Sequence, residues 1–212
     1  QMCIRDRFTT EGRQKEVILD IPMPDETLES FVILNAPVMH PNLAAKYPEI
    51  QTYAGYKKGD PSTRVRLDFT PHGFHAMIRS PYHNAIFIEP YSRFQVENYL
   101  VYYKKDNPRS EPFKCEFDEV NEVEKDRNVL KKQDELLRSV AGDCTLRTYR
   151  LALACTGEYA TFHGGTKPLV LAAMNTSMNR VNGIYEDDIS VTMVIIPNNE
   201  DIIYLDGDSD PY

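Results

Sequence analysis

The sequence has 212 residues, of which 42% are hydrophobic and 26% charged, the composition of a globular protein with one large domain or two small ones. Its net charge of -8 argues against a nucleic acid or an anionic membrane as a partner, because both require a basic surface. No apolar run approaches the roughly 20 residues that a membrane-spanning helix needs, so no membrane span is predicted.

The first seven residues, QMCIRDR, fit no pattern in the rest of the chain. They lack the apolar stretch of a secretory signal peptide, and three of the seven are charged. We interpret residues 1–7 as foreign or disordered. If they are foreign, a native leader has been lost, and its absence says nothing about the compartment.

Residues 8–105 are predicted to form a β-rich, antiparallel domain. Runs rich in β-branched and aromatic residues alternate with turn-forming segments that contain Pro, Gly, Asn or Asp. Residues 64–69 alternate between polar and apolar types, which predicts a strand with one solvent-exposed face. A short helix is expected at 41–47, because Pro41 suits its first turn and Pro48 ends it. The predicted strands are residues 17–21, 30–34, 64–70, 74–78, 85–89 and 99–103.

Residues 106–144 are rich in charges of both signs and poor in apolar residues. We interpret this segment as a charged, partly helical linker between two domains rather than as a binding tail.

The cysteines predict neither a disulfide scaffold nor a structural zinc site. No two of the four are spaced as in a zinc knuckle, and four are few for a chain of this length. A pair between Cys144 and Cys155 is conceivable, but Cys155 ends an apolar run. We therefore interpret Cys155 as a buried thiol that packs as a small hydrophobic residue.

Residues 145–212 are predicted to form an incomplete α/β unit, so the whole chain is assigned to the α+β class. Apolar runs at 148–155 and 190–196 are typical of strands covered on both faces. Between them, a Gly-containing loop (156–166) leads into a helix with Thr166 as its N-cap. Strand, helix and strand form a right-handed βαβ unit.

The predicted helix has one apolar face, because its apolar residues recur at spacings of three and four. A sheet must cover this face. A short return strand is expected at 202–205. The apolar residues of the face are Leu171, Met174, Met178, Val181 and Tyr185.

No catalytic or metal-binding motif is complete in the chain. HExxH is absent, and residues 164–168 (GGTKP) lack the residue order of a P-loop. His72 and His75 lie three apart in a predicted strand and should point to opposite faces, so they cannot chelate one ion. His163 is interpreted as a surface histidine. No catalytic or metal-binding residue is therefore predicted.

Two weaker patterns are also interpreted as structural. Residues 206–210 (DGDSD) begin like a calcium-binding loop, but an acidic turn is the preferred interpretation. The glycosylation sequon at 175–177 falls inside the predicted helix and is discounted.

Residues 146–212 closely resemble the opening part of the reprolysin-like metallopeptidases, a branch of the metzincin zinc proteases, in their bacterial secreted form. The most specific part of the resemblance is the sequence VNGIYE at 181–186. Residues 8–105 resemble the pro-region of the same proteins more loosely, through 31–36, 53–56 and 64–74. The residues that carry the first resemblance are 146–154 (LRTYRLALA), 156–159 (TGEY), 172–175 (AAMN), 179–188 (NRVNGIYEDD) and 210–212 (DPY).

The resemblance implies a zinc metalloendopeptidase that is made as a secreted or cell-surface zymogen and acts on protein or peptide substrates. Its HExxHxxGxxH motif, with three histidines on zinc and a glutamate as general base, would lie beyond Tyr212. The present chain would then be the pro-region plus a truncated first half of the catalytic domain, and would be inactive. Arg150 stands near the place of the family's calcium-binding glutamate, which puts that calcium site in doubt. Activation cleavage is expected within 104–138.

Two other interpretations stay open. The first is a non-enzymatic extracellular β-rich binding or adhesion module with an appended α/β piece, and the second is a degenerate protease retained as a binding protein. The first of these interpretations expects the parent reading frame to continue without a zinc motif.

Family pro-regions can place a cysteine thiolate on the zinc, and Cys115 follows the last predicted strand of the pro-region. Cys115 is therefore the candidate cysteine switch; the alternative is a buried or free thiol. We predict that Cys115→Ala in a full-length zymogen raises peptidase activity before the pro-region is removed. Unchanged latency in a peptide-hydrolysis assay would argue against the switch.

Overall fold

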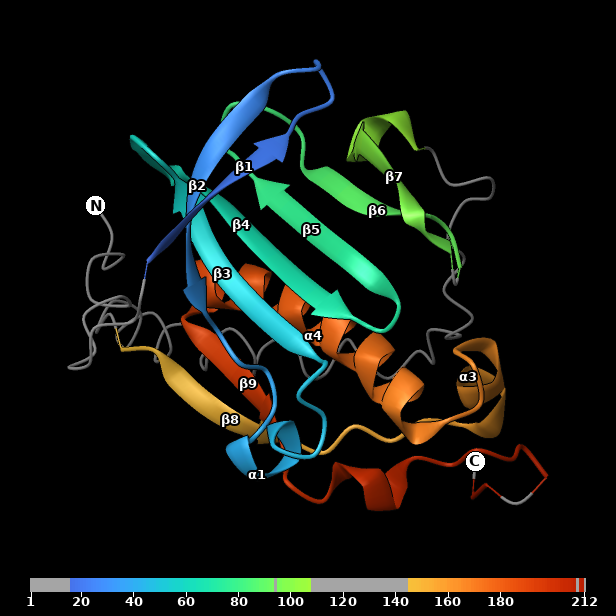
Figure 1. Cartoon of the computed structure of the whole chain (residues 1–212). Coiled ribbons are helices and arrows are strands. Elements are labelled where there is room, and N and C mark those ends of the chain that lie inside the picture. The colour runs from blue at the N-terminus through green and yellow to red at the C-terminus, as the bar shows by residue number, and fades with distance from the viewer. Residues whose placement is uncertain (1–15, 94, 108–144, 209, 212) are drawn as a thin grey trace, which may run out of the picture. The chain divides into compact units, whose positions relative to one another are not determined.

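A computed structural model describes residues 16–93, 95–107, 145–208 and 210–211. Apart from Thr145, these residues lie in one compact unit (Figure 1). None of its helices is long and apolar enough to cross a membrane. The elements in chain order are β1 (Val17–Pro22), β2 (Leu28–Asn35), α1 (Pro41–Ala44), β3 (Gln51–Lys57), β4 (Asp60–Thr70), β5 (Gly73–Arg79), β6 (Ile86–Ser92), β7 (Gln95–Tyr103), η2 (Lys104–Asp106), β8 (Arg147–Leu151), α3 (Gly157–Phe162), α4 (Lys167–Ile189), β9 (Val191–Ile195) and η3 (Asn199–Ile202).

Strands β1 to β7 form a seven-stranded sheet in which each strand pairs antiparallel with the next one in sequence. This meander confirms the predicted antiparallel, β-rich part of the α+β fold. Strand β3 is missing from the sequence-based prediction because Ala54 and Gly55 have low β propensity. Gly55 is nevertheless required, since a Cβ atom there would lie 2.4 Å from the Val32 carbonyl oxygen.

One face of this sheet carries an apolar core of its own. Val65 and Leu67 of β4 are 1% exposed, and Phe31 and Ile78 from other strands are completely buried. Each such side chain stabilises the fold by about 1.5–3 kcal/mol relative to an exposed one.

Strands β8 and β9 pair in parallel and are connected through α3 and α4, in the predicted order of strand, helix and strand. Strand β8 is shorter than expected, and all its residues before Leu151 are exposed. The expectation that it is covered on both faces is wrong for the described residues, because the side chains of 147–150 on both faces are exposed. The segment 156–166 is more than a loop, since Thr156 caps α3 by accepting a hydrogen bond from Tyr159 N at 3.4 Å.

Helix α4 buries its predicted apolar face in a second core, against β9 and residues 38–50. Leu171, Met174 and Met178 are at most 8% exposed, whereas Tyr185 at the far end is 41% exposed. Thr166 is the N-cap, as predicted, although its side chain makes no capping hydrogen bond.

The connection between β2 and β3 contributes to the βαβ part of the structure. Ile195 N donates to Val38 O at 2.8 Å, and His40 N donates to Ile195 O at 2.9 Å, so Met39 forms a parallel bridge at the edge of β9. The predicted short helix follows as α1, with Leu43 completely buried in the same core as the apolar residues of α4. The edge of β9 is therefore covered by a segment that precedes it by about 150 residues.

Two buried asparagine side chains form hydrogen bonds to backbone groups that a neighbouring strand would otherwise pair with. Asn182 of α4 donates from Nδ2 to Met193 O at 2.8 Å and accepts from Met193 N at 3.0 Å. Asn199 makes the same two contacts with Leu153, at 3.0 and 2.8 Å. Both side chains are at most 2% exposed, so each amide satisfies a backbone N–H and C=O that water does not reach easily.

We predict that Asn182→Ala lowers the free energy of unfolding by about 1–3 kcal/mol, because both backbone groups of Met193 lose their partner. Urea unfolding followed by circular dichroism measures this loss. The control is Asn198→Ala, which removes an exposed side chain and should change stability by less than about 0.5 kcal/mol. Equal effects of the two substitutions would contradict the role assigned to the Asn182 amide.

Candidate functional site

The polar face of the antiparallel sheet lies against helix α4 (Figure 1). Arg64, Arg66 and Asp68 of β4 alternate with the apolar core residues, as the sequence pattern requires. Their side chains are only 15%, 11% and 2% exposed. The prediction that this face is open to solvent is therefore wrong, because α4 covers it.

At the C-terminal end of α4, arginines of the sheet pair with carboxylates of the helix. Arg66 forms an ion pair with Glu186. Arg79 Nη1 lies 3.2 Å from Asp187 Oδ2, and Arg64 Nε lies 3.9 Å from Asp187 Oδ1. These side chains are at most 30% exposed, so solvent screens the pairs less than it would on the surface.

Gly183 allows the helix to approach the sheet at this point. A Cβ atom at Gly183 would lie 2.7 Å from Arg66 Cγ. Its carbonyl oxygen accepts a hydrogen bond from Arg79 Nη1 at 2.9 Å. Asn182, Gly183 and Glu186 thus each have a packing role, and all three belong to the segment 179–188 singled out in the sequence.

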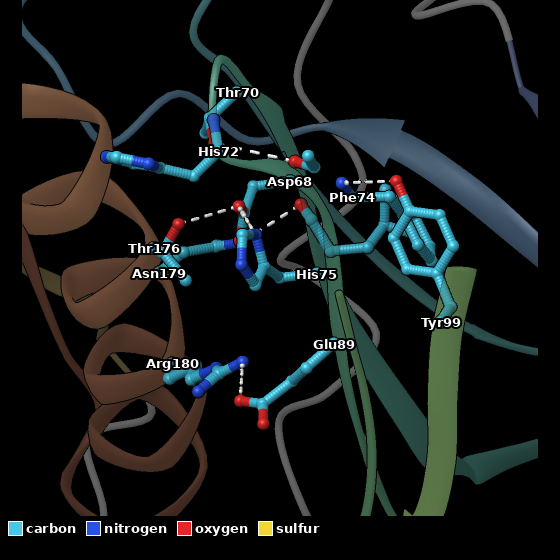
Figure 2. Close-up of polar contacts among 12 residues, drawn as sticks. Asp68, Thr70, His72, Phe74, His75, Glu89, Tyr99, Thr176, Asn179 and Arg180 are labelled. Atoms are coloured by element: carbon cyan, nitrogen blue, oxygen red, sulfur yellow. Dashed lines mark hydrogen bonds and ion pairs between the residues drawn. The ribbon is translucent and has the colours of Figure 1, made fainter. Parts of the chain in front are cut away.

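Opposite the middle of helix α4, Asp68 of strand β4 is the centre of a buried polar cluster (Figure 2). Its Oδ1 accepts from Thr176 Oγ1 at 2.8 Å and lies 3.1 Å from His75 Nδ1. Next to it, Asn179 Nδ2 donates to Leu67 O at 2.9 Å. Helix α4 therefore hydrogen-bonds to both a side chain and the backbone of β4.

One turn further along α4, Arg180 Nη2 donates to Glu89 Oε1 of β6 at 2.9 Å (Figure 2). Tyr102 Oη donates to the other oxygen of Glu89 at 2.7 Å. Burial by itself would raise the pKa of the Glu89 carboxyl, but the Tyr102 hydroxyl and the Arg180 guanidinium together hold that pKa below its ordinary value.

A cavity of about 530 Å³ lies between the sheet and helices α3 and α4. Three histidines line it: His72 from the turn between β4 and β5, His75 from β5, and His163 at the end of α3. The rings of His72 and His163 meet edge to face, 5.9 Å apart between centroids. The cavity is lined by His72, His75, Glu89, Pro90, Ser92, Arg93, Phe162, His163, Ala173, Thr176, Ser177 and Arg180.

The histidines differ from their sequence-based interpretation. His72 and His75 do not point to opposite faces of one strand, because His72 lies in a turn, and both line the cavity. His163 is half-buried rather than a surface residue. Even so, the described part of the chain contains no group of three or more His, Cys, Asp or Glu residues arranged to hold a metal ion.

The other residues singled out in the sequence have structural roles where they are described. Cys155 is a buried free thiol, as predicted, and burial raises its pKa. Asn175 of the sequon is completely buried and donates to Leu171 O at 2.8 Å. In the acidic turn, Asp210 Oδ2 accepts from Gly157 N at 2.8 Å. Cys115, the candidate switch, lies outside the described residues.

The TGEY and DPY segments, about 50 residues apart in sequence, meet in space. Besides the bond from Gly157 N to Asp210, a Cβ atom at Gly157 would lie 2.0 Å from Gly207 N. Only glycine leaves room for the backbone of the acidic turn to pass here.

Both segments lie within a stretch of the chain that is similar to a known family. Residues 145–212 match the family model of metallo-peptidase family M12B, reprolysin-like. This third of the chain is reprolysin-like. The match confirms the family resemblance of this segment and supports a peptidase as the parent protein. A search of curated proteins finds no match to the chain.

The contact residues of α4 are absent from the sequence-based site prediction, although the sequence contains a signal for them. Polar residues and a glycine recur along α4 at helical spacing, opposite its apolar face. A helix with an apolar face and a second face of this kind packs against two partners. The residues are Thr176, Asn179, Arg180, Gly183 and Glu186.

We predict that Arg66→Met and Glu186→Gln each lower the free energy of unfolding by about 1–3 kcal/mol. The double variant should lose at least about 0.5 kcal/mol less stability than the sum of the two single losses. Each single change leaves a partly buried charge without its main partner. Urea unfolding of the four proteins gives the coupling energy. The control is the more exposed ion pair between Lys57 and Glu29, whose coupling energy should be less than about 1 kcal/mol. Additive effects at 66 and 186 would show that the pair does not hold α4.

Proposed function

We propose that this chain is part of a secreted zinc metalloendopeptidase made as a zymogen, with residues 8–105 as the pro-region, 106–144 as the linker and 145–212 as the first half of the catalytic domain. The reprolysin-like match over 145–212 is the observation that carries this proposal. Members of such a family hydrolyse peptide bonds in protein or peptide substrates with a zinc-bound water.

The contacts of α4 add support from the residues themselves. The segment most specific to the resemblance, 181–186, lies where the antiparallel sheet meets α4. Glu186 pairs with Arg66, and the absence of a side chain at Gly183 leaves space for Arg66. A pro-region that folds against its enzyme needs such a contact, and polar, partly buried pairs are suited to an interface that must later separate.

A second contact supports the same assignment. Residues 38–50 cover one edge of β9 and the apolar face of α4. The βαβ part is thus completed by the proposed pro-region, which supplies buried residues such as Val38 and Leu43. A pro-region that contributes core residues would stabilise the unfinished catalytic half.

The described residues do not fit a zinc ion. No group of three or more potential ligands converges within them, and the sequence contains no HExxH. No catalytic step is therefore derived for this chain. We propose that the zinc ligands and the catalytic glutamate belong to an HExxHxxGxxH motif of the parent protein outside these 212 residues, and that this chain by itself is inactive.

The alternative function, a non-enzymatic extracellular binding or adhesion module, makes a different prediction about the gene. Under our proposal the reading frame encodes HExxHxxGxxH within roughly 150 residues, about one domain length, after Tyr212. Under the alternative it does not.

We predict that the full-length product, after removal of the pro-region, cleaves an unstructured protein substrate, that a zinc chelator abolishes this activity, and that added zinc restores it. The 212-residue chain, assayed in parallel with zinc, should release no peptides. Sequencing the gene beyond the codon for Tyr212 comes first. A reading frame that lacks the motif, or full-length activity that is insensitive to the chelator, contradicts the proposal.

A further inference from the structure

The cavity between the antiparallel sheet and helices α3 and α4 is lined mainly by basic side chains. Its volume of about 530 Å³ is that of a small-molecule site. Two arginines, Arg93 and Arg180, and three histidines line it. Among the described residues of the lining, Glu89 provides the one carboxylate. The whole chain has a net charge of -8, so the sign of this lining differs from that of the molecule as a whole.

The carboxylate of Glu89 is already occupied. Arg180 Nη2 donates to one of its oxygens at 2.9 Å, and Tyr102 Oη donates to the other at 2.7 Å (Figure 2 shows the first of these bonds). Arg180 keeps unused donor capacity, since its Nε is buried and has no hydrogen-bond partner. Glu89 therefore balances the charge of Arg180 and leaves that of Arg93.

Arg93 is held in place by Phe162 of helix α3. The guanidinium carbon of Arg93 lies 3.3 Å from the centre of the Phe162 ring, and Nη1 donates to Phe162 O at 2.7 Å. No carboxylate of the described residues pairs with Arg93. A guanidinium has five N–H donors, so the contact with Phe162 leaves several of them for a ligand. Because the group is already oriented, a ligand that binds it costs less side-chain entropy.

The nearest other carboxylate, Asp68, is not part of the lining. Its side chain is 2% exposed. Its Oδ1 accepts from Thr176 Oγ1 at 2.8 Å and lies 3.1 Å from His75 Nδ1. Asp68 thus has its own partners in the contact between β4 and α4 and does not compensate the charge of Arg93.

The helices add further polar groups to the cavity wall. Ser177 of α4 lines the cavity and is exposed, so its hydroxyl is accessible. His163 at the end of α3 is half-buried, with the Tyr159 ring 4.4 Å from its own ring between centroids. Burial lowers the pKa of His163, and the charges of His72 and Arg93 lower it further. An anion beside Arg93 would offset part of this shift, so anion binding and proton uptake by His163 favour each other.

We propose that this cavity is a binding site for a small oxyanion, a phosphate or carboxylate group that accepts hydrogen bonds from Arg93 and from other donors in the wall. Guanidinium groups bind both kinds of oxyanion through paired, charge-assisted hydrogen bonds. The site is a property of the 212-residue chain and does not depend on the proposed function. Where that function holds, the bound anion connects the pro-region with the catalytic half.

The first test is isothermal titration of the 212-residue chain with sodium phosphate and with sodium acetate, at pH 7 and constant ionic strength. At least one of the two anions should bind saturably at one site per chain. Arg93→Gln should weaken this binding roughly tenfold, the loss of one charge-assisted hydrogen bond. Lys58→Gln removes an exposed positive charge outside the cavity and should leave the affinity within about twofold. Equal effects of the two substitutions, or no saturable binding to the wild type, overturn the proposal.

The second test leaves Arg93 unchanged and locates the anion in the cavity. Ser177→Glu places a carboxylate in the cavity wall, and Ser177→Gln places an uncharged side chain of the same size there. Both residues are compatible with a helix, and circular dichroism checks that each variant keeps its fold. The S177E variant should bind neither anion measurably, whereas S177Q should keep most of the affinity. Equal binding by the two variants would show that the anion binds elsewhere.

The third test uses sulfate, because its charge is the same at pH 6 and pH 8. The histidines of the cavity gain positive charge over this range as the pH falls, so the wild-type chain should bind sulfate several-fold more tightly at pH 6. An affinity that does not rise contradicts the proposal. None of these tests measures peptide hydrolysis, so the proposed function keeps its own experiment.

Discussion

The arrangement of the described residues depends on one constraint: strand β4 has two different faces, and both are covered from Thr63 to Asp68. Its apolar face, with Val65 and Leu67, forms the core of the antiparallel sheet. Its polar face carries charges that are costly to bury without partners. Helix α4 supplies those partners through Thr176, Glu186 and Asp187. The charged face therefore specifies which helix surface lies on the sheet, while apolar packing supplies most of the stability.

Helix α4 is correspondingly a helix with two partners. Its apolar side packs on β9 and on residues 38–50, and its polar side packs on β4. Asn182 lies between these environments and fixes the distance to β9 through the backbone of Met193. The ten residues of the segment 179–188 take part in the apolar packing, in the polar contacts with the sheet and in the hydrogen bonds to the backbone of Met193. Its sequence is therefore restricted by packing as well as by any role in a catalytic domain.

The sequence predicts the antiparallel meander, the βαβ order, the N-cap at Thr166 and the buried thiol of Cys155, because each depends on local periodicity or on a short pattern. It does not predict that the polar face of β4 is covered, since alternation shows that a strand has two faces but not what lies against them. His72 and His75 illustrate the same limit. Their shared cavity depends on a tight turn at 71–72 and on a helix about 100 residues away.

The contacts of α4 with the sheet join residues that are 91 to 123 positions apart in the chain, and Lys46 pairs with Glu200 across 154 positions. The strands of the meander, in contrast, pair with their immediate neighbours in sequence. Loop closure costs least for short separations, so local pairings are expected to form early during folding and distant ones late. The sheet can therefore acquire its own core while the C-terminal residues are still being synthesised. Helix α4 and β9 then complete their folding on a surface that already exists.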